Sequence, residues 1–237
     1  MSTIARLMIT LDDVTLPVLR RIEVPLTIRL DRLHRTLQAA MGWTNSHLYE
    51  LRARNIGWGI ADPDFGGGPL DARKARLIDV LEDTGVKTLG YIYDFGDQWE
   101  HTIKIERIAP AVPGAPYPCL LEAIGRCPPE DVGGPPGYEE LLAAKADPTH
   151  ERRAELDEWM DLDAFDPTLV DIRVLDRALL KLALKWTGEL TVQEVSANLA
   201  STLNEKGAEV TERIDRATHG LVDALAQQGG QVVDRLA

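Results

Sequence analysis

The sequence predicts an α+β fold: a mainly antiparallel sheet covered by helices, followed by an amphipathic helical C-terminal extension. Three observations support this prediction. Segments that alternate apolar and polar residues, as strands do, lie mostly in the first half of the chain. Segments with apolar residues three and four positions apart, as in helices, lie among them and dominate the second half. The two kinds do not follow the regular βαβ order that a parallel sheet requires.

Two strands and a helix are expected at the start of the chain. Residues 4–13 alternate and end in a turn signal, and residues 20–25 alternate until Pro25. The two segments could pair as a hairpin across the loop between them. The following residues predict an amphipathic helix of about three turns, which Asp31 is expected to cap and Gly42 to end.

The next segments predict a strand, a loop and a short helical piece. Residues 47–55 return to alternation and are expected to form a strand. Residues 61–72 are rich in Asp, Pro and Gly, which is typical of turns. Residues 75–83 predict a short helix or turn.

The stretch YIYDFGDQWEHTIKIE holds the densest group of aromatic and polar residues in the chain. Strands are expected at 87–94 and 98–107, joined by a short turn in which Gly96 supplies permissive backbone geometry. Odd-numbered side chains of residues 89–105 would then line the interior of this ribbon. The acidic tip of the hairpin would be free to meet the later Cys-Pro-Pro-Glu-Asp loop.

The second half of the chain predicts helices. Residues 109–118 are rich in proline and are not expected inside a sheet. Residues 137–146 predict a helix. A second helix is expected to begin with Asp147 as its cap and Pro148 in its first turn, and a third to begin in the same way at Asp166-Pro167.

The end of the chain is expected to be separate from the main domain. We place the α+β domain at residues 1–185 and a helical tail at residues 186–237. Apolar residues of the tail recur at three, four or seven positions, which is typical of a coiled-coil seam. Such a helix cannot bury its seam alone, so residues 190–237 are expected either to self-associate or to fold back on the domain.

No signal peptide and no transmembrane helix are expected from the sequence. The first residues lack an apolar run with a small-residue cleavage site. Nowhere does the chain reach the roughly 18 consecutive apolar residues of a transmembrane helix, so no membrane association is expected. Two cysteines, Cys119 and Cys127, are fewer than a secreted disulfide scaffold normally has. These observations favour the cytoplasm.

The charge of the chain disfavours DNA as a partner. The formal net charge is −12 at pH 7. Residues 1–56 carry eight Lys and Arg against five Asp and Glu, whereas the remainder carries 18 against 33. Most of the surface should therefore repel phosphate backbones. If DNA binds, the N-terminal arginines are the candidates, above all Arg20, Arg21, Arg32 and Arg35.

Several acidic residues and histidines are candidates for a metal-dependent site. Asp94, His101 and Asp131 are the candidate catalytic residues, and Cys127 and His150 are further candidate ligands. Carboxylates with one or two histidines can hold a divalent metal that activates water. The spacing matches no standard metal motif, because the cysteines form no CxxC pair and HExxH is absent. The cofactor is therefore unknown, with a divalent metal possible.

Each of these groups also has a structural interpretation. His101 shares the inner face of the hairpin, so it can be a core histidine with a satisfied hydrogen bond. Glu130 and Asp131 can cap backbone N–H groups of a proline-rich loop. Asp147 and His150 lie three residues apart and can pair across one helical turn.

Other catalytic and nucleotide-binding motifs are missing from the sequence. It contains no GxSxG and no P-loop, and its Asp-Phe-Gly triplet lacks the other motifs of a kinase. Residues 33–48 resemble half of a helix-turn-helix. However, the residues that follow alternate as a strand, which disfavours DNA recognition there.

Five blocks carry a resemblance to a known family: ITLDDVTLPVLRRIEVP, LHRTLQAAMGWTNSHLYEL, YDFGDQWEHTIKIE, CPPEDVGGPPGYEELL and DPTHERRAELDEW. Over residues 4–185 the chain resembles the Ri-plasmid open-reading-frame-three-like family, whose members are often labelled passenger proteins of insertion elements and called TnpR. The resemblance implies an α+β domain without an established activity. Many members have Trp where Leu19 stands and Cys where Val132 stands, so an obligate three-cysteine metal site is not implied for this chain.

Three hypotheses of function follow. The first is a binding or adaptor domain associated with mobile elements and without catalysis, with a possible protein partner. The second is a metal-dependent hydrolase or nuclease centred on Asp94, His101 and Asp131. The third is a DNA-binding accessory protein that uses the N-terminal arginines.

Overall fold

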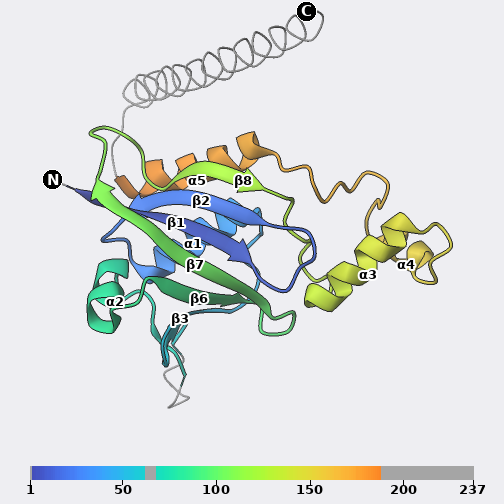
Figure 1. The fold of residues 1–237 in the computed structure, drawn as a ribbon, viewed down its shortest axis with the longest axis horizontal. Helices are drawn as coiled ribbons and strands as arrows, with labels where there is room; N and C mark the ends of the chain where they lie inside the picture. The colour runs from blue at the N-terminus through green and yellow to red at the C-terminus, as the bar shows by residue number, and fades with distance from the viewer. Residues whose placement is uncertain (1, 62–67, 188–237) are drawn as a thin grey trace, which may run out of the picture. The chain divides into compact units, whose positions relative to one another are not determined.

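The structure is a computed structural model that describes residues 2–61 and 68–187. Its fold is α+β, as the sequence predicts (Figure 1). The helical tail expected at residues 186–237 lies, from residue 188 onward, outside the described residues.

One sheet of eight strands forms the framework, in the order β5-β4-β3-β6-β7-β1-β2-β8. All neighbouring strands pair antiparallel except β4 and β5, which are parallel. The strands are β1 (Thr3–Leu11), β2 (Leu19–Pro25), β3 (Tyr49–Ala53), β4 (Ile56–Gly59), β5 (Leu70–Asp71), β6 (Thr88–Tyr93), β7 (Trp99–Pro110) and β8 (Cys119–Ile124).

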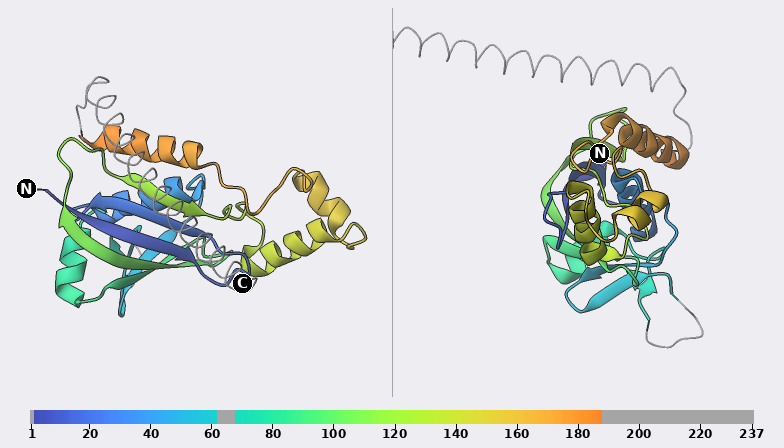
Figure 2. Two further views of the ribbon diagram at one scale, coloured as in Figure 1. Left: turned by 45° about the horizontal axis from the view of Figure 1, so that its top comes forward. Right: turned by 90° about the vertical axis from the view of Figure 1, so that its right-hand side faces the viewer.

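Helices cover one face of the sheet and extend beyond one end of it. Helices α1 and α5 pack against each other, and α5 also packs against β8 (Figures 1 and 2). Helices α3 and α4 lie together past the end of the strands. The helices are α1 (Leu30–Met41), α2 (Leu77–Thr84), α3 (Gly134–Ala146), α4 (Arg153–Trp159) and α5 (Ile172–Thr187).

The β6–β7 hairpin has the predicted inner face. Tyr91 is paired with His101 and Tyr93 with Trp99, so odd-numbered residues of both strands point to the same side. Trp99 is 1% exposed and Ile103 is completely buried. Alternation along the two strands therefore placed the aromatic side chains in the core, where α1 covers them.

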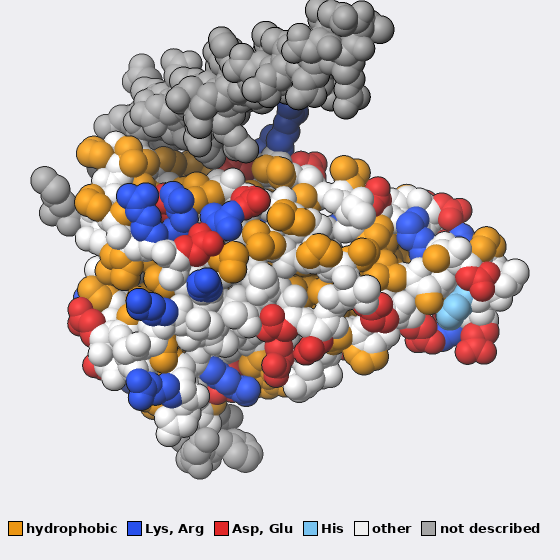
Figure 3. Space-filling model, viewed as in Figure 1, with side chains coloured by type: hydrophobic (Ala, Val, Ile, Leu, Met, Phe, Trp, Pro, Cys, Tyr) orange, Lys and Arg blue, Asp and Glu red, His pale blue; other side chains and the backbone are white. Residues whose placement is uncertain are grey.

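The opposite face of the sheet is charged. Arg6 binds Glu23 at 2.9 Å, and Arg21 binds Glu106 at 2.8 Å and also contacts Glu122. Figure 3 shows basic side chains beside acidic ones on this side of the molecule. Exposed pairs of this kind contribute little stability, typically below about 1 kcal/mol each, and they neutralise much of the positive charge locally.

Two helices start later than the sequence suggests. Asp147 accepts hydrogen bonds from the N–H and hydroxyl of Thr149, and Asp166 does the same with Thr168. Each Asp-Pro-Thr therefore closes a local turn instead of capping a helix. Helix α4 starts at Arg153, and α5 starts at Ile172. The carboxylate of Asp171, just before α5, accepts the N–H groups of Arg173 and Val174 in the first turn.

The expected cap of α1 is also different. The residue before the helix is Arg29, which makes no capping hydrogen bond through its side chain. Asp31 lies in the first turn and binds Arg29 instead. The end of the helix is as predicted: Gly42 adopts a φ of 89° and donates its N–H to Gln38.

The sequence does not predict three of the strands: β4, β8 and the two-residue β5, which lies within residues 61–72, where turns are expected. Strand β4 follows β3 after a tight turn and pairs with it. Two of its four residues are glycines, so it lacks the alternating apolar side chains by which a strand is predicted. Strand β8 follows the proline-rich segment directly, and it pairs only with β2 at the edge of the sheet. An edge position tolerates neighbouring prolines because one side of the strand needs no partner.

The hairpin tip docks on the loop before α3. The N–H of Gly133 donates to Asp97 at 3.1 Å. Gly134 adopts a φ of 69°, and a Cβ added there would collide with the backbone carbonyl of Asp97. Only glycine combines that left-handed geometry with so close an approach.

We expect Gly134→Ala to destabilise the domain by roughly 1–3 kcal/mol, because it forces strained backbone and pushes the loop away from the hairpin. Urea unfolding followed by circular dichroism measures the change. The matched control is Gly68→Ala, at a site where an added Cβ meets nothing within 4 Å. Equal stability of the two variants would contradict the assigned role of Gly134.

Candidate metal centre

Three potential metal ligands converge beside the hairpin tip. His47, Asp94 and Asp131 each present one ligand atom, and these atoms lie within 4.8 Å of one another. The Nδ1 atom of His47 is 3.5 Å from Asp94 Oδ2, and its Nε2 atom is 3.0 Å from Asp131 Oδ1. Across residues 2–61 and 68–187 this is the one group of three or more such side chains.

Asp94 is held rigidly at the end of β6. It adopts a φ of 59°, and its N–H donates to the carbonyl of Leu48 at 2.9 Å. Its Oδ1 atom accepts from the N–H groups of Gly96 and Asp97, so it fixes the turn. The other oxygen, Oδ2, faces His47, and the residue is only 8% exposed. One carboxylate thus serves the turn and the cluster at once.

A hydrogen-bonded bridge positions the other two ligands. The hydroxyl of Tyr93 donates to Glu130 at 2.7 Å and accepts the N–H groups of Ser46 and His47. The second oxygen of Glu130 accepts the N–H of Thr44 at 2.8 Å. Glu130 therefore ties the loop that carries Asp131 to the loop that carries His47.

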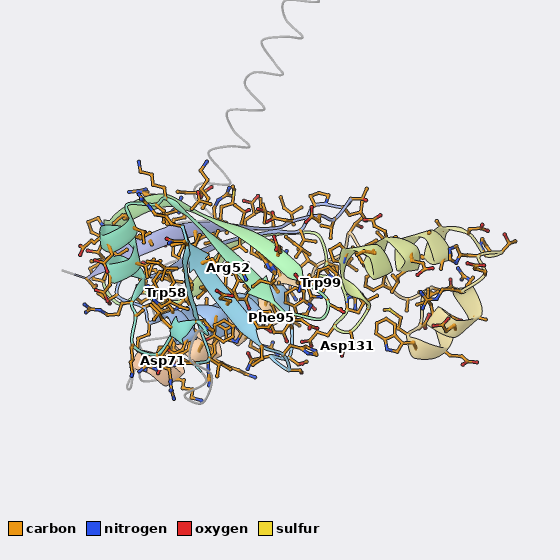
Figure 4. All side chains as sticks on the ribbon, turned by 90° about the horizontal axis from the view of Figure 1, so that it is seen from below. Arg52, Trp58, Asp71, Phe95, Trp99 and Asp131 are labelled. Atoms are coloured by element: carbon orange, nitrogen blue, oxygen red, sulfur yellow. The ribbon has the colours of Figure 1, made fainter. Side chains whose placement is uncertain are left out.

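Trp43 adds a second tie between the same two loops. Its indole N–H donates to the carbonyl of Pro128 at 2.9 Å, and its ring stacks on Tyr93 with centroids 5.1 Å apart. Burial and the contact with Glu130 raise the pKa of Tyr93, so its hydroxyl stays protonated and continues to donate. Figure 4 shows Asp131 near Phe95 of the hairpin turn, where the sheet meets α3.

The arrangement suits a divalent cation. One imidazole and two carboxylates form a ligand set of the kind that Mn²⁺, Fe²⁺ and Zn²⁺ accept. The buried Nε2 atom of His47 has no hydrogen-bond partner, because its approach to Asp131 lies outside hydrogen-bonding geometry. Asp131 is exposed, which leaves the cluster open to water and to a small molecule.

A hollow of about 630 Å³ adjoins the cluster. His47 lines it together with Arg35 and Arg73. Arg73 is engaged by Asp71 at 2.9 Å, whereas no ion pair of Arg35 is present in the described part of the chain. The hollow therefore has the Arg35 guanidinium and the His47 imidazole in the same wall.

Comparison with known proteins places the chain in a family. A model of the plasmid pRiA4b ORF-3-like proteins matches residues 3–174. The chain belongs to the plasmid pRiA4b ORF-3-like protein family. It is similar to protein y4hQ of Sinorhizobium fredii, described as uncharacterized, with 55% identity over 78% of this chain and 95% of that protein.

The family fold also occurs in a solved structure. The crystal structure of MM3350 from Methanosarcina mazei Go1, titled a protein of unknown function, superposes with a TM-score of 0.65 at 32% identity. The match covers 73% of this chain and 97% of that one. In this pRiA4b ORF-3-like chain, no helix among the described residues is long and apolar enough to cross a membrane.

His101 lies in the core and not in the cluster. It is 2% exposed, its Nδ1 atom is 3.0 Å from the carbonyl of Trp99, and Trp43 packs edge-on against its ring. Burial lowers the pKa of His101 to about 4, so the ring is neutral at pH 7. The imidazole that joins Asp94 and Asp131 is that of His47.

The remaining candidate ligands lie apart from the cluster. Cys127 is buried, and burial raises the pKa of its thiol, which disfavours the thiolate that metals bind. His150 lies between α3 and α4, where its Nδ1 atom accepts the N–H of Arg152. The Asp147 carboxylate accepts from Thr149, and His150 contacts Asp147 through the backbone, its N–H donating to the Asp147 carbonyl at 3.1 Å.

The four N-terminal arginines do not form one surface. Arg20 points into the core and is completely buried, whereas its neighbour Arg21 points to the opposite face and binds two glutamates. Arg32 packs over the ring of Trp186, and Arg35 lines the hollow beside His47. Strand alternation separates the first two, so together they cannot track a phosphate backbone.

A second histidine, His34, anchors the loop that carries His47. Tyr91 accepts from Gln38 and lies 2.9 Å from His34 Nδ1, so its hydroxyl donates to that nitrogen. The other ring nitrogen of His34 contacts the side-chain oxygen of Asn45, whose N–H binds Gln38. Burial lowers the pKa of His34 to about 4, so the ring is neutral at pH 7. A neutral ring can accept the Tyr91 hydroxyl at one nitrogen and donate to Asn45 from the other.

His47 could have been found from the sequence only through the fold. It lies in a polar stretch before β3, far in sequence from both aspartates. The pairing of β3 with β6, with Tyr49 opposite Tyr93, brings the start of β3 beside Asp94. His47 is therefore identified by the register between strands that are distant in sequence, and not by any local spacing of residues.

The two buried histidines predict an acid-sensitive fold. Both pKa values lie near 4 when folded, against 6.5 ordinarily. Between these values the unfolded chain binds more protons, so stability falls as pH decreases from about 6.5 to about 4, by up to roughly 3 kcal/mol per imidazole. His101→Gln should reduce this slope, measured by urea unfolding across the pH range. An unchanged slope would show that His101 does not titrate in this way.

Proposed function

We propose that this protein is a divalent-metal-dependent hydrolase whose metal ligands are His47, Asp94 and Asp131. The observation that carries the proposal is the convergence of one imidazole and two carboxylates within 4.8 Å at an open edge of the domain. A metal with three protein ligands keeps positions for water, and its charge lowers the pKa of that water toward neutrality.

The surroundings support a reacting site more than a purely structural ion. Structural zinc sites usually close the coordination shell with four protein ligands, whereas this cluster offers three. Asp94 is fixed by its turn, and Tyr93 and Glu130 fix the two loops. Such support holds ligands in place while one side of the metal stays open.

A small substrate fits better than a polynucleotide. The adjoining hollow has the size of a small-molecule site, and Arg35 places a positive charge in it. The net charge of −12 opposes a long phosphate backbone. A small anionic ester is therefore the proposed class of substrate.

A titration of the full chain with Mn²⁺, Zn²⁺ and Mg²⁺ tests the metal centre. At a metal concentration 100 times the Kd, binding should stabilise the fold by about 2.7 kcal/mol, or about 5–10 °C in Tm for a domain of this size. Calorimetry should give one site. Asp94→Asn, which keeps an oxygen for the turn, should weaken binding at least tenfold.

His47→Gln and His150→Gln form a matched pair, because each removes one imidazole and only the first lies in the cluster. Hydrolysis of 4-nitrophenyl phosphate, followed at 1 mM metal, should be lost in His47→Gln and kept in His150→Gln. Metal binding without hydrolysis would reject the enzyme and keep the metal centre. An absence of saturable binding by all three ions would reject both.

A binding or adaptor role without catalysis is the second candidate. Leu169, Ile172 and Val174 are exposed apolar residues around the start of α5, which a protein partner would be able to cover. This second proposal includes an association with insertion elements and a cytoplasmic location. The cytoplasmic location is supported by the low cysteine content alone.

A further inference from the structure

A second cavity, distinct from the metal centre, contains a buried guanidinium without a counter-charge. It measures about 440 Å³ and lies between the end of α1, the segment before α5 and the loop that starts at Cys127. Arg20 is among its lining residues and is completely buried. The cavity is otherwise walled mainly by apolar side chains, among them Met41, Trp43, Phe165 and Leu175.

The hydrogen bonds of Arg20 leave part of its guanidinium unsatisfied. Nε donates to the carbonyl of Ala40, and Nη1 donates to those of Leu19 and Ile124, each at 2.8 Å. Nη2 is buried and has no partner. Ala40 lies in the last turn of α1, so the negative end of the helix dipole partly compensates the charge. One buried donor remains without a partner, which is unfavourable because the group has lost its hydrogen bonds to water.

No carboxylate of the described chain supplies the missing counter-charge. Arg20 takes part in none of the ion pairs there. Glu130 and Asp171 also line the cavity, but Glu130 is held by Tyr93 and Thr44, and Asp171 accepts the first N–H groups of α5. Burial keeps the Cys127 thiol neutral by raising its pKa.

A second cation lies at the same cavity. Arg126 is exposed, lines the cavity, and places its guanidinium 4.7 Å from the ring centre of Phe165. Like Arg20, it forms no ion pair within the described residues. The cavity thus combines a buried cation, an exposed cation at an aromatic wall, and apolar surfaces between them.

We propose that this cavity binds a small organic monocarboxylate with an apolar body. The carboxylate pairs with Arg20 and satisfies Nη2, and the apolar body packs among Met41, Trp43 and Phe165. A charge-assisted hydrogen bond in a site shielded from water is stronger than a neutral one. The volume matches pockets that enclose small ligands. A multiply charged phosphate suits the apolar walls less well.

Calorimetry of the full chain with straight-chain carboxylates from butyrate to decanoate and with 4-phenylbutyrate tests this proposal. At least one carboxylate should bind with one site per chain, and the amide of the same acid should bind at least tenfold more weakly. If no carboxylate of the panel binds, or if acid and amide bind equally, the proposal is overturned.

Variants locate the site. Val174 and Ile172 are both exposed residues of α5, but only Val174 lines the cavity. Val174→Trp should obstruct the cavity and weaken carboxylate binding at least tenfold, whereas Ile172→Trp should not. Arg20→Met should abolish binding if the variant folds. Because it strands three carbonyl groups and can fail to fold, Arg126→Gln provides a second test and should reduce affinity several-fold. Unchanged affinity in Val174→Trp would overturn the assignment.

The metal centre and this cavity are tested independently. Asp131→Asn removes a proposed metal ligand and leaves the carboxylate cavity intact, so metal binding should be lost while carboxylate affinity is unchanged. A loss of both in Asp131→Asn would overturn the separation of the two sites.

Discussion

The attachment of the loop of residues 127–134 to the β6–β7 hairpin positions the residues of both proposed sites in this domain. Glu130 bridges the Tyr93 hydroxyl and the backbone of Thr44, and Gly133 and Gly134 sit against Asp97. These contacts are polar and short, and they join three segments that are distant in sequence. Without these contacts, nothing would hold the loop that carries Asp131 beside His47. The same loop begins at Cys127, which lines the cavity of Arg20, so one attachment shapes both sites.

The β6–β7 hairpin and its inner face could be predicted because they follow from alternation within single segments. Trp99 and Ile103 are buried as the pattern of the hairpin requires, and Gly42 ends α1 as glycine usually does. The helix starts at Asp147 and Asp166 were wrong because Asp-Pro-Thr has two local solutions. The aspartate either caps a helix or closes a turn with the threonine, and the sequence of three residues does not distinguish them.

The candidate site was predictable only in part, for a related reason. The sequence predicts that the hairpin tip meets the proline-rich loop, and the structure brings Asp94 and Asp131 together at that contact. The sequence predicts His101 on the inner face of the hairpin, either as a ligand or as a core histidine, and the structure buries it in the core. His47 depends on the pairing of β3 with β6, which is a property of the whole sheet. The buried guanidinium of Arg20 depends in the same way on three segments closing around it.

The interior position of β1, between β7 and β2, has a consequence for how the chain is made. β1 is synthesised well before β7, yet it pairs with β7 along its length, from Thr3 opposite Pro110 to Leu11 opposite His101. Until about a hundred further residues have left the ribosome, the β1–β2 hairpin has an open edge of unpaired backbone groups, where other chains can add. Sheets with such distant pairing also fold slowly. Removal of the first eleven residues would separate β2 and β8 from the other strands, so a deletion at this end of the chain would divide the sheet in two.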